Sequence, residues 1–238
     1  EGKVIRRVNG PATKGFHRVA WDLRYPSPNS IALGGKSEGF GFLAPPGEYT
    51  VTMYVQQDGE IKRLSKSQNF DVVPLRSGAL PTKSQSTITA FWREYESAVK
   101  RGMAIQMTVA NTLKKIKSMQ LAMDQSTADV GNMDRRLNEI RTSIMKMDQN
   151  LSGNRSKMGP GEKRDPTVGS RLFVIQRVIE YSTYGPTETA KENLFLANKG
   201  MDEIQAQLNE NQKSLTSLGR RLMKNGAPWV EGDPIPKK

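Results

Sequence analysis

The fold predicted for the first third of the chain rests on two stretches of sequence, GFHRVAWDLRY (Gly15–Tyr25) and PPGEYTVTMY (Pro45–Tyr54). Each alternates its side chains between two faces, as a half-buried β-strand requires. In the first stretch one face holds Phe16, Arg18, Ala20, Asp22 and Arg24, and the other holds His17, Val19, Trp21, Leu23 and Tyr25. The pair indicates a small β-sandwich that carries no reactive group.

Further strand signals surround these two stretches. Asp58-Gly59 lies between apolar residues and is typical of a tight hairpin turn. The expected strands are Lys3–Val8, Phe16–Leu23, Gly47–Gln56 and Lys66–Val73. Four or five strands in about 75 residues predict an antiparallel sandwich of immunoglobulin-like type, with one or two further strands expected upstream of Glu1.

Beyond residue 80 the apolar residues repeat at steps of three and four, which is the spacing of helices packed lengthwise. The pattern predicts four helices, at about Ser86–Met123, Val130–Leu151, Pro166–Tyr184 and Thr187–Lys224. At about 1.5 Å per residue the longest would extend about 55 Å. The predicted fold is therefore an Ig-like antiparallel β-sandwich followed by an elongated antiparallel four-helix bundle, with a pair of long helical hairpins as the alternative.

Composition places the domain boundaries. The segment Pro74–Ser86 is rich in turn formers and reads as a linker. We expect a sandwich over residues 1–78, a linker over 79–86, a helical bundle over 87–228 and a tail over 229–238. Asn211 falls in the apolar seam of the last helix, where a polar residue sets the register between helices.

The net charge of +12 is spread along the 238 residues. Residues 1–85 hold 12 Lys and Arg against 7 Asp and Glu, and residues 86–238 hold 24 against 17. This favours a solvated basic surface over a nucleic-acid footprint. No run is long enough for a membrane-spanning helix, and the absence of cysteine excludes disulfides and thiol catalysis. The start at Glu1 indicates a piece of a longer polypeptide.

The sequence offers no catalytic centre. His17 is the only histidine and has no nucleophile or second metal ligand beside it, so a structural or surface role is favoured. Asp22 and Glu48 are the one carboxylate pair on neighbouring predicted strands, and surface ion pairing is favoured over acid–base catalysis. No phosphate-binding glycine loop occurs. We expect no catalytic residue, cofactor or metal site.

The aromatic residues suggest packing between domains instead. Phe91, Trp92 and Tyr95 cover nearly the whole circumference of the first helix at its start, which is more than one seam needs. With Trp21 and Tyr49 they are the candidates for contact between domains or with a partner, since buried aromatics dominate such contacts. The equal alternative for the helical cluster is the thick end of the bundle core.

Three segments resemble a known module. Gly2–Arg6, Gly15–Arg24 and Pro45–Val51 are similar to the Ig-like module of the flagellar hook-capping protein, which recurs in secreted bacterial proteins. The helical continuation through Pro186-Thr187 to Leu218–Pro228 resembles the C-terminal end of large bacterial proteins with sortilin-like or sialidase-type (BNR-repeat) β-propellers, often labelled glycosyl hydrolases. The resemblance implies a propeller upstream of Glu1 and supplies no catalytic residue here.

The functional expectation follows from this resemblance. It implies a non-catalytic accessory region of a secreted or cell-envelope bacterial protein that packs on its own propeller or binds a partner. One alternative is a part of a carbohydrate-active enzyme whose catalytic residues lie in the propeller. Another is a module that binds anionic surface glycans through its basic surface. Possible partners also include other cell-envelope proteins.

Overall fold

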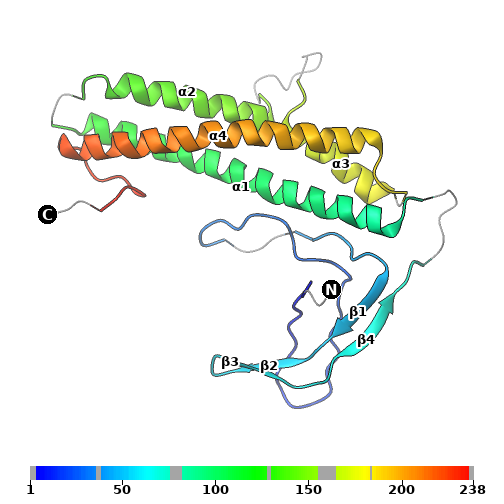
Figure 1. Ribbon diagram of the computed structural model, residues 1–238. Helices are drawn as coiled ribbons and strands as arrows, with labels where there is room; N and C mark the ends of the chain where they lie inside the picture. Colours follow the sequence, from blue (N-terminus) through cyan, green and yellow to red (C-terminus); the bar gives the residue numbers. More distant parts are fainter. Residues whose placement is uncertain are drawn as a thin grey trace.

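The computed structural model describes residues 4–35, 39–75, 82–127, 130–154, 165–182 and 184–235. It has two parts, shown in Figure 1. A long helical rod lies above a smaller N-terminal part that contains short strands. The rod holds nearly all of the hydrophobic core among the described residues. The two parts therefore differ sharply in how well they are packed.

Four helices are present where the apolar periodicity places them. They are α1 (Gln85–Asp124), α2 (Met133–Ser152), α3 (Val168–Tyr181) and α4 (Glu188–Lys224). Hydroxyl side chains cap three of the helix starts, because each accepts a bond from a backbone N–H that has no partner inside the helix. The capping residues are Ser84, Thr167 and Thr187.

The prediction of a four-helix bundle is wrong in its cross-section. α2 and α3 together span the length that α1 and α4 each span alone, and both pack against that long pair (Figure 1). Gly169 in the first turn of α3 lies against the end of α2, since a Cβ built there would be 2.9 Å from the Leu151 carbonyl oxygen. The rod is thus three helices thick, and the middle helix is broken into α2 and α3. The chain between α2 and α3 includes residues 155–164, which lie outside the described part.

The core of the rod follows the seams that the sequence predicts. At 40 residues α1 is about 60 Å long, and apolar side chains are buried along its length. The most deeply buried large side chains in the described rod are Val109, Ile116, Met119, Met133, Leu137, Ile144, Met147, Ile175, Met201 and Leu222. Asn211 on α4 donates a hydrogen bond to Ser143 Oγ on α2 at 3.0 Å, which ties the register of these two helices.

The prediction of an Ig-like β-sandwich is also wrong. The described N-terminal part holds two two-stranded antiparallel sheets and one isolated bridge, with no facing pair of sheets. Residues 4–8 and Phe16–Leu23, both expected to be strands, have no ladder partner there. A sandwich needs two sheets whose inner faces bury each other, whereas the side chains of these strands are mostly exposed.

The two sheets are successive stretches of one long hairpin. β1 (Gly47–Val51) pairs with β4 (Gln68–Val72), and β2 (Tyr54–Gln57) pairs with β3 (Glu60–Arg63). The Leu64 amide donates to the Met53 carbonyl at 2.9 Å, so the chains stay together across the irregular stretch between the sheets. The hairpin signal at Asp58-Gly59 is confirmed: both residues have positive φ, 51° and 83°, as a type I′ turn requires.

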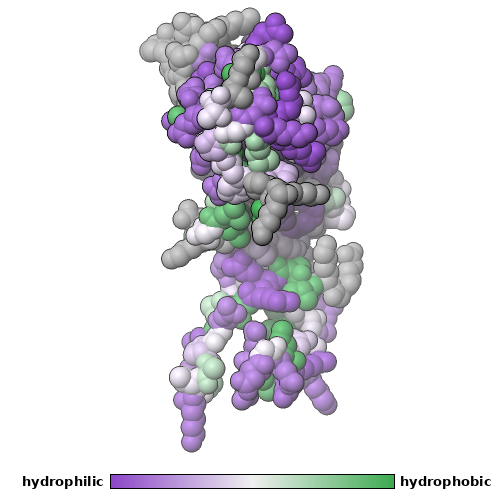
Figure 2. Space-filling model, turned by 90° about the vertical axis from the view of Figure 1, so that its left-hand side faces the viewer, coloured by the Kyte–Doolittle hydropathy of each residue, from purple (hydrophilic) through white to green (hydrophobic). Residues whose placement is uncertain are grey.

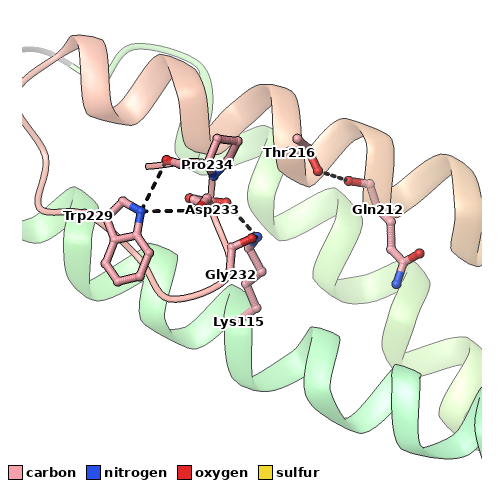
Figure 3. A network of polar contacts seen from close by, with 7 residues as sticks. All are labelled: Lys115, Gln212, Thr216, Trp229, Gly232, Asp233 and Pro234. Carbon is pink, nitrogen blue, oxygen red and sulfur yellow. Dashed lines mark hydrogen bonds and ion pairs between the residues drawn. The ribbon is translucent and has the colours of Figure 1, made fainter. Parts of the chain in front are cut away.

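The C-terminal tail folds back on the rod (Figure 3). Trp229 Nε1 donates to the carbonyls of Asp233 and Pro234, each at 3.3 Å. The Asp233 side chain is 1% exposed, and its Oδ1 lies 2.6 Å from Lys115 Nζ on α1. A Cβ on Gly219 of α4 would lie 2.4 Å from Asp233 Oδ2. The tail thus clasps α1 to α4.

The expected linker at residues 79–86 is described only in part. Residues 76–81 lie outside the described part, and α1 already begins at Gln85. Within the described chain, no helix is long and apolar enough to cross a membrane.

Candidate interdomain interface

The rod and the N-terminal part meet through the loop that connects residue 21 to residue 44. Among the described elements the strand backbones do not approach the helix backbones closely, and the ring contacts between the two parts come from this loop. A short ladder shapes the loop: the Tyr25 amide donates to the Phe42 carbonyl at 2.9 Å, and the Ala44 amide donates to the Leu23 carbonyl at 2.7 Å. These bonds bring Tyr25 and Phe42, 17 residues apart, to the same place beside α1.

Gly41 allows the two sides of this ladder to approach. A Cβ at residue 41 would lie 1.9 Å from the Tyr25 carbonyl oxygen and 2.5 Å from the Pro26 carbonyl oxygen. Only glycine fits so close to a neighbouring backbone. The Gly41 carbonyl also accepts a bond from Arg24 Nη1 at 2.9 Å. Gly41 therefore has a structural use in this loop.

Two contacts join the loop to α1. The guanidinium of Arg93 lies over the ring of Tyr25, 3.3 Å from its centre. The ring of Phe42 meets that of Tyr95 edge-on, with 5.5 Å between the ring centres. Cation–π contacts and edge-to-face pairs each contribute about 0.5–1.5 kcal/mol. The junction is therefore small and rests on a few aromatic rings.

Glu96 holds Arg93 in place beneath the loop. Glu96 is 6% exposed, and its carboxylate forms ion pairs with both Arg93 and Lys100. The two ion pairs offset part of the cost of burying this carboxylate. Arg93 Nη2 is buried and has no hydrogen-bond partner among the described residues. The cation–π contact with the Tyr25 ring is therefore a main contact of this guanidinium.

The aromatic residues expected at an interface separate into two groups. Trp21 and Tyr49 form a cluster with Phe70 over the β1–β4 sheet, with ring centres 5.5–6.3 Å apart. Phe91 and Tyr95 are buried in the core of the rod, and Trp92 is partly buried against it. Among the described ring contacts, none joins a residue of the first group to a residue of the second. Phe42 and Tyr25 connect the two groups instead.

One tyrosine hydroxyl in each group is hydrogen-bonded to a backbone carbonyl. The pKa of Tyr49 is raised, mainly by burial and next by the neighbouring Tyr25, while the charge of Arg93 acts to lower it. Tyr49 donates its hydroxyl hydrogen to the Pro45 carbonyl at 2.6 Å. Tyr95 donates to the Leu172 carbonyl on α3 at 3.0 Å, and burial raises its pKa well above the ordinary range of tyrosine. Both hydroxyls are kept neutral and structural.

The carboxylates and the histidine considered for chemistry have structural partners. Asp22 Oδ1 accepts the Arg24 amide at 3.0 Å, and Glu48 Oε1 accepts Asn69 Nδ2 at 2.9 Å. His17 Nε2 contacts the Thr13 carbonyl at 2.7 Å. Among the described residues no group of three or more His, Cys, Asp or Glu is arranged to hold a metal ion.

Sequence reasoning missed the residues that make the junction. The signal for Glu96 is present in the spacing of Arg93, Glu96 and Lys100, since charges three and four residues apart face each other on a helix. Phe42 and Tyr25 carry no such signal, because only the fold of their loop brings them to α1. Comparison of the chain with protein-family models, with curated proteins and with solved structures finds no match.

Proposed function

We propose that this chain is a non-catalytic interaction region, in which the N-terminal part docks on a folded partner domain and the rod acts as a spacer. One observation carries the proposal. Large apolar side chains throughout the N-terminal part lie in solvent, including Phe16 at 92% exposure, Leu33 at 105% and Phe40 at 82%. So many large apolar side chains left in solvent in one part of the chain favour an interaction surface there.

Figure 2 supports the same contrast. On the face shown, the rod at the top is mostly hydrophilic, whereas hydrophobic residues are exposed in the middle and lower parts of the molecule. The rod buries its own apolar seams, although some large side chains such as Phe173 and Phe195 are exposed on its surface. The described N-terminal part buries almost none of its large apolar side chains.

The physics of short strands points the same way. A lone two-stranded hairpin is at best marginally stable in water, and independent stability needs a third strand or a covering layer. Here β1 pairs only with β4 among the described residues, and the aromatic cluster of Trp21, Tyr49 and Phe70 is its main packing. Docking on another domain would supply the missing layer.

A β-propeller of a secreted or cell-envelope bacterial protein is the partner domain that we propose. This part rests on the resemblance of the helical continuation, through Pro186-Thr187 to Leu218–Pro228, to the C-terminal end of such proteins. A propeller presents rigid sheet surfaces on which a small unfinished β part can pack. In this arrangement the 40-residue α1 carries the other end of the rod about 60 Å away from the propeller.

Site-specific photo-crosslinking tests this function. A photoreactive phenylalanine analogue at Phe16 or at Phe40, in the protein expressed in its source cells, should form an adduct that maps to a propeller domain. The same analogue at Leu121, which is 56% exposed on α1, is the matched control and should form little adduct. An absence of adducts at Phe16 and Phe40 would overturn the interaction function. Adducts confined to other kinds of protein would overturn the choice of a propeller.

A further inference from the structure

The N-terminal segment of residues 4–22, here named the basic arm, is extended and exposed. All of its residues are exposed except Ile5 and Trp21, which are partly buried. No backbone–backbone hydrogen bond joins residues 4–22 to another residue of the described chain. An extended segment with unpaired N–H and C=O groups is a template on which another strand can pair.

The arm is held at both ends and bends in the middle. Arg6 Nη1 donates to the Tyr25 carbonyl at 3.1 Å, and Trp21 packs on the rings of Tyr49 and Phe70. Gly15, with φ of 139°, lies at the bend. The second limb, Phe16–Asp22, therefore leads directly into the aromatic cluster, and its geometry is set before any partner arrives. Such preorganisation lowers the entropy lost on binding.

The alternation of side chains assigns the two faces of this limb. Trp21 faces the hairpin through its ring contacts, so Val19 shares that face in an extended chain, and Phe16, Arg18, Ala20 and Asp22 share the other. Phe16 is 92% exposed, and Arg18 is exposed as well. At the start of this limb a paired strand would meet an apolar and a cationic side chain two residues apart, and the carboxylate of Asp22 lies at the other end, beside the aromatic cluster.

The charge of the arm selects the chemistry of the partner. The arm carries Arg6, Arg7, Lys14 and Arg18 against the single carboxylate of Asp22. Opposite charges directly across a strand pair stabilise it and like charges destabilise it. A second copy of this chain, with its net charge of +12, is a poor match, and an acidic strand is a good one.

We propose that the limb Phe16–Asp22 pairs, as an added β-strand, with an extended acidic strand of a partner protein. The partner strand carries an apolar residue opposite Phe16 and a carboxylate opposite Arg18. This inference rests on the proposed interaction function and adds the mode of contact and the charge of the partner. Main-chain bonds supply affinity in such strand addition, and the alternating side chains supply specificity.

The test uses the full chain and a fluorescent nine-residue probe peptide that alternates glutamate with valine. A counterpart with lysine in place of glutamate is the control peptide. Fluorescence anisotropy should show binding of the acidic peptide alone, weakening as the ionic strength rises. Hydrogen exchange should show protection of every second amide within residues 16–22, because a strand paired along one edge engages alternate N–H groups.

A charge reversal at Arg18 checks the pairing of side chains. Arg18→Glu should weaken binding of the acidic peptide about tenfold and improve binding of the lysine peptide. Arg220→Glu, at an exposed position on α4, makes the same change in net charge and should leave both affinities within about twofold. Equal effects of the two variants would overturn the assigned pairing.

The remaining outcomes are decisive in the same way. Salt-sensitive binding without protection of alternate amides would show attraction of charges alone and overturn strand addition. Doubling of the mass in sedimentation, with protection of residues 16–22 in the absence of peptide, would make a second copy the occupant and overturn the acidic partner. Propeller adducts at Phe16 combined with no peptide binding would leave the proposed function standing and this inference refuted.

Discussion

Substitution of Gly219 by alanine should destabilise the protein although Gly219 lies inside a helix. In an unobstructed helix the change from glycine to alanine stabilises by about 1 kcal/mol. Here the new Cβ would lie 2.4 Å from Asp233 Oδ2 and 2.9 Å from Asp233 Cγ. The Asp233 side chain is 1% exposed and is held by Lys115, so it cannot swing aside without leaving its site.

The magnitude follows from the contacts that the tail would lose. Displacing Asp233 breaks its ion pair with Lys115 and the bond from Lys115 to the Gly232 carbonyl. Hydrogen bonds to charged groups contribute about 1.5–3 kcal/mol. After the gain in helix propensity is subtracted, we expect a net loss of about 1–2 kcal/mol in the free energy of unfolding. Release of the tail sets the upper limit, since the rod itself need not deform.

Urea unfolding followed by circular dichroism measures this loss, and a double-mutant cycle with Asp233→Ala isolates its cause. Once the carboxylate is removed, Gly219→Ala should stabilise by about 1 kcal/mol, which is a coupling of about 2–3 kcal/mol between the two positions. Gly102→Ala is the matched control, because its Cβ would meet only side-chain atoms, the nearest at 3.3 Å. Equal effects of Gly219→Ala with and without the Asp233 carboxylate would refute the clasp in Figure 3.

Three further predictions concern the junction and the core. Gly41→Ala should open the loop, because the new Cβ would overlap the Tyr25 carbonyl. If this overlap costs about 2 kcal/mol, the Tyr25 amide should lose about 30-fold of its protection against hydrogen exchange. Unchanged protection would contradict the close approach of the two backbones. Tyr95→Phe should cost about 1 kcal/mol near neutral pH, since it removes the bond to the α3 backbone. Burial raises the pKa of Tyr95 in the folded state, so the stability that the neutral hydroxyl gives is complete below pH of about 10 and declines above it. The urea midpoints of wild type and variant should therefore converge as the pH rises past that value. A constant difference between the two midpoints would argue against the burial of the hydroxyl. Asn211→Leu should raise the free energy of unfolding by about 1 kcal/mol and broaden the amide spectrum, because the bond to Ser143 is exchanged for apolar packing with less defined register. A lower free energy of unfolding would argue against a register role.

The helices were predictable because their periodicity is long and their caps are local. In α2, steps of three and four residues from Met133 to Leu151 bury every member of the seam. The arrangement of the helices was not predictable in the same way. Nothing in the apolar pattern says whether α2 and α3 lie side by side or end to end, since both arrangements bury the same faces. The helix lengths favour the end-to-end arrangement, because α2 with 20 residues and α3 with 14 are together nearly as long as α4 with 37.

The strands were over-predicted for a physical reason. Alternation in Phe16–Leu23 shows that these residues suit a half-buried strand, and it says nothing about where the covering layer comes from. The hairpin signal at Asp58-Gly59 is local and was correct, whereas the sandwich depends on long-range pairing that the described chain does not make. Of the expected interface residues, Trp21 and Tyr49 gather with Phe70, but the bridge through Phe42 and Arg93 depends on the course of a loop.

The mismatch between pattern and structure is itself informative about function. A sequence with strand alternation and a structure with exposed apolar side chains fit the proposal that the strand finds its neighbour in another polypeptide segment. Val19 and Phe16 satisfy both conditions, since they alternate correctly and lie 49% and 92% exposed. By contrast, every seam residue of α2 predicted as core is buried within the rod. The unfulfilled prediction therefore falls on the one part of the chain where a partner strand would complete the fold, and the exchange experiment on residues 16–22 addresses that part directly.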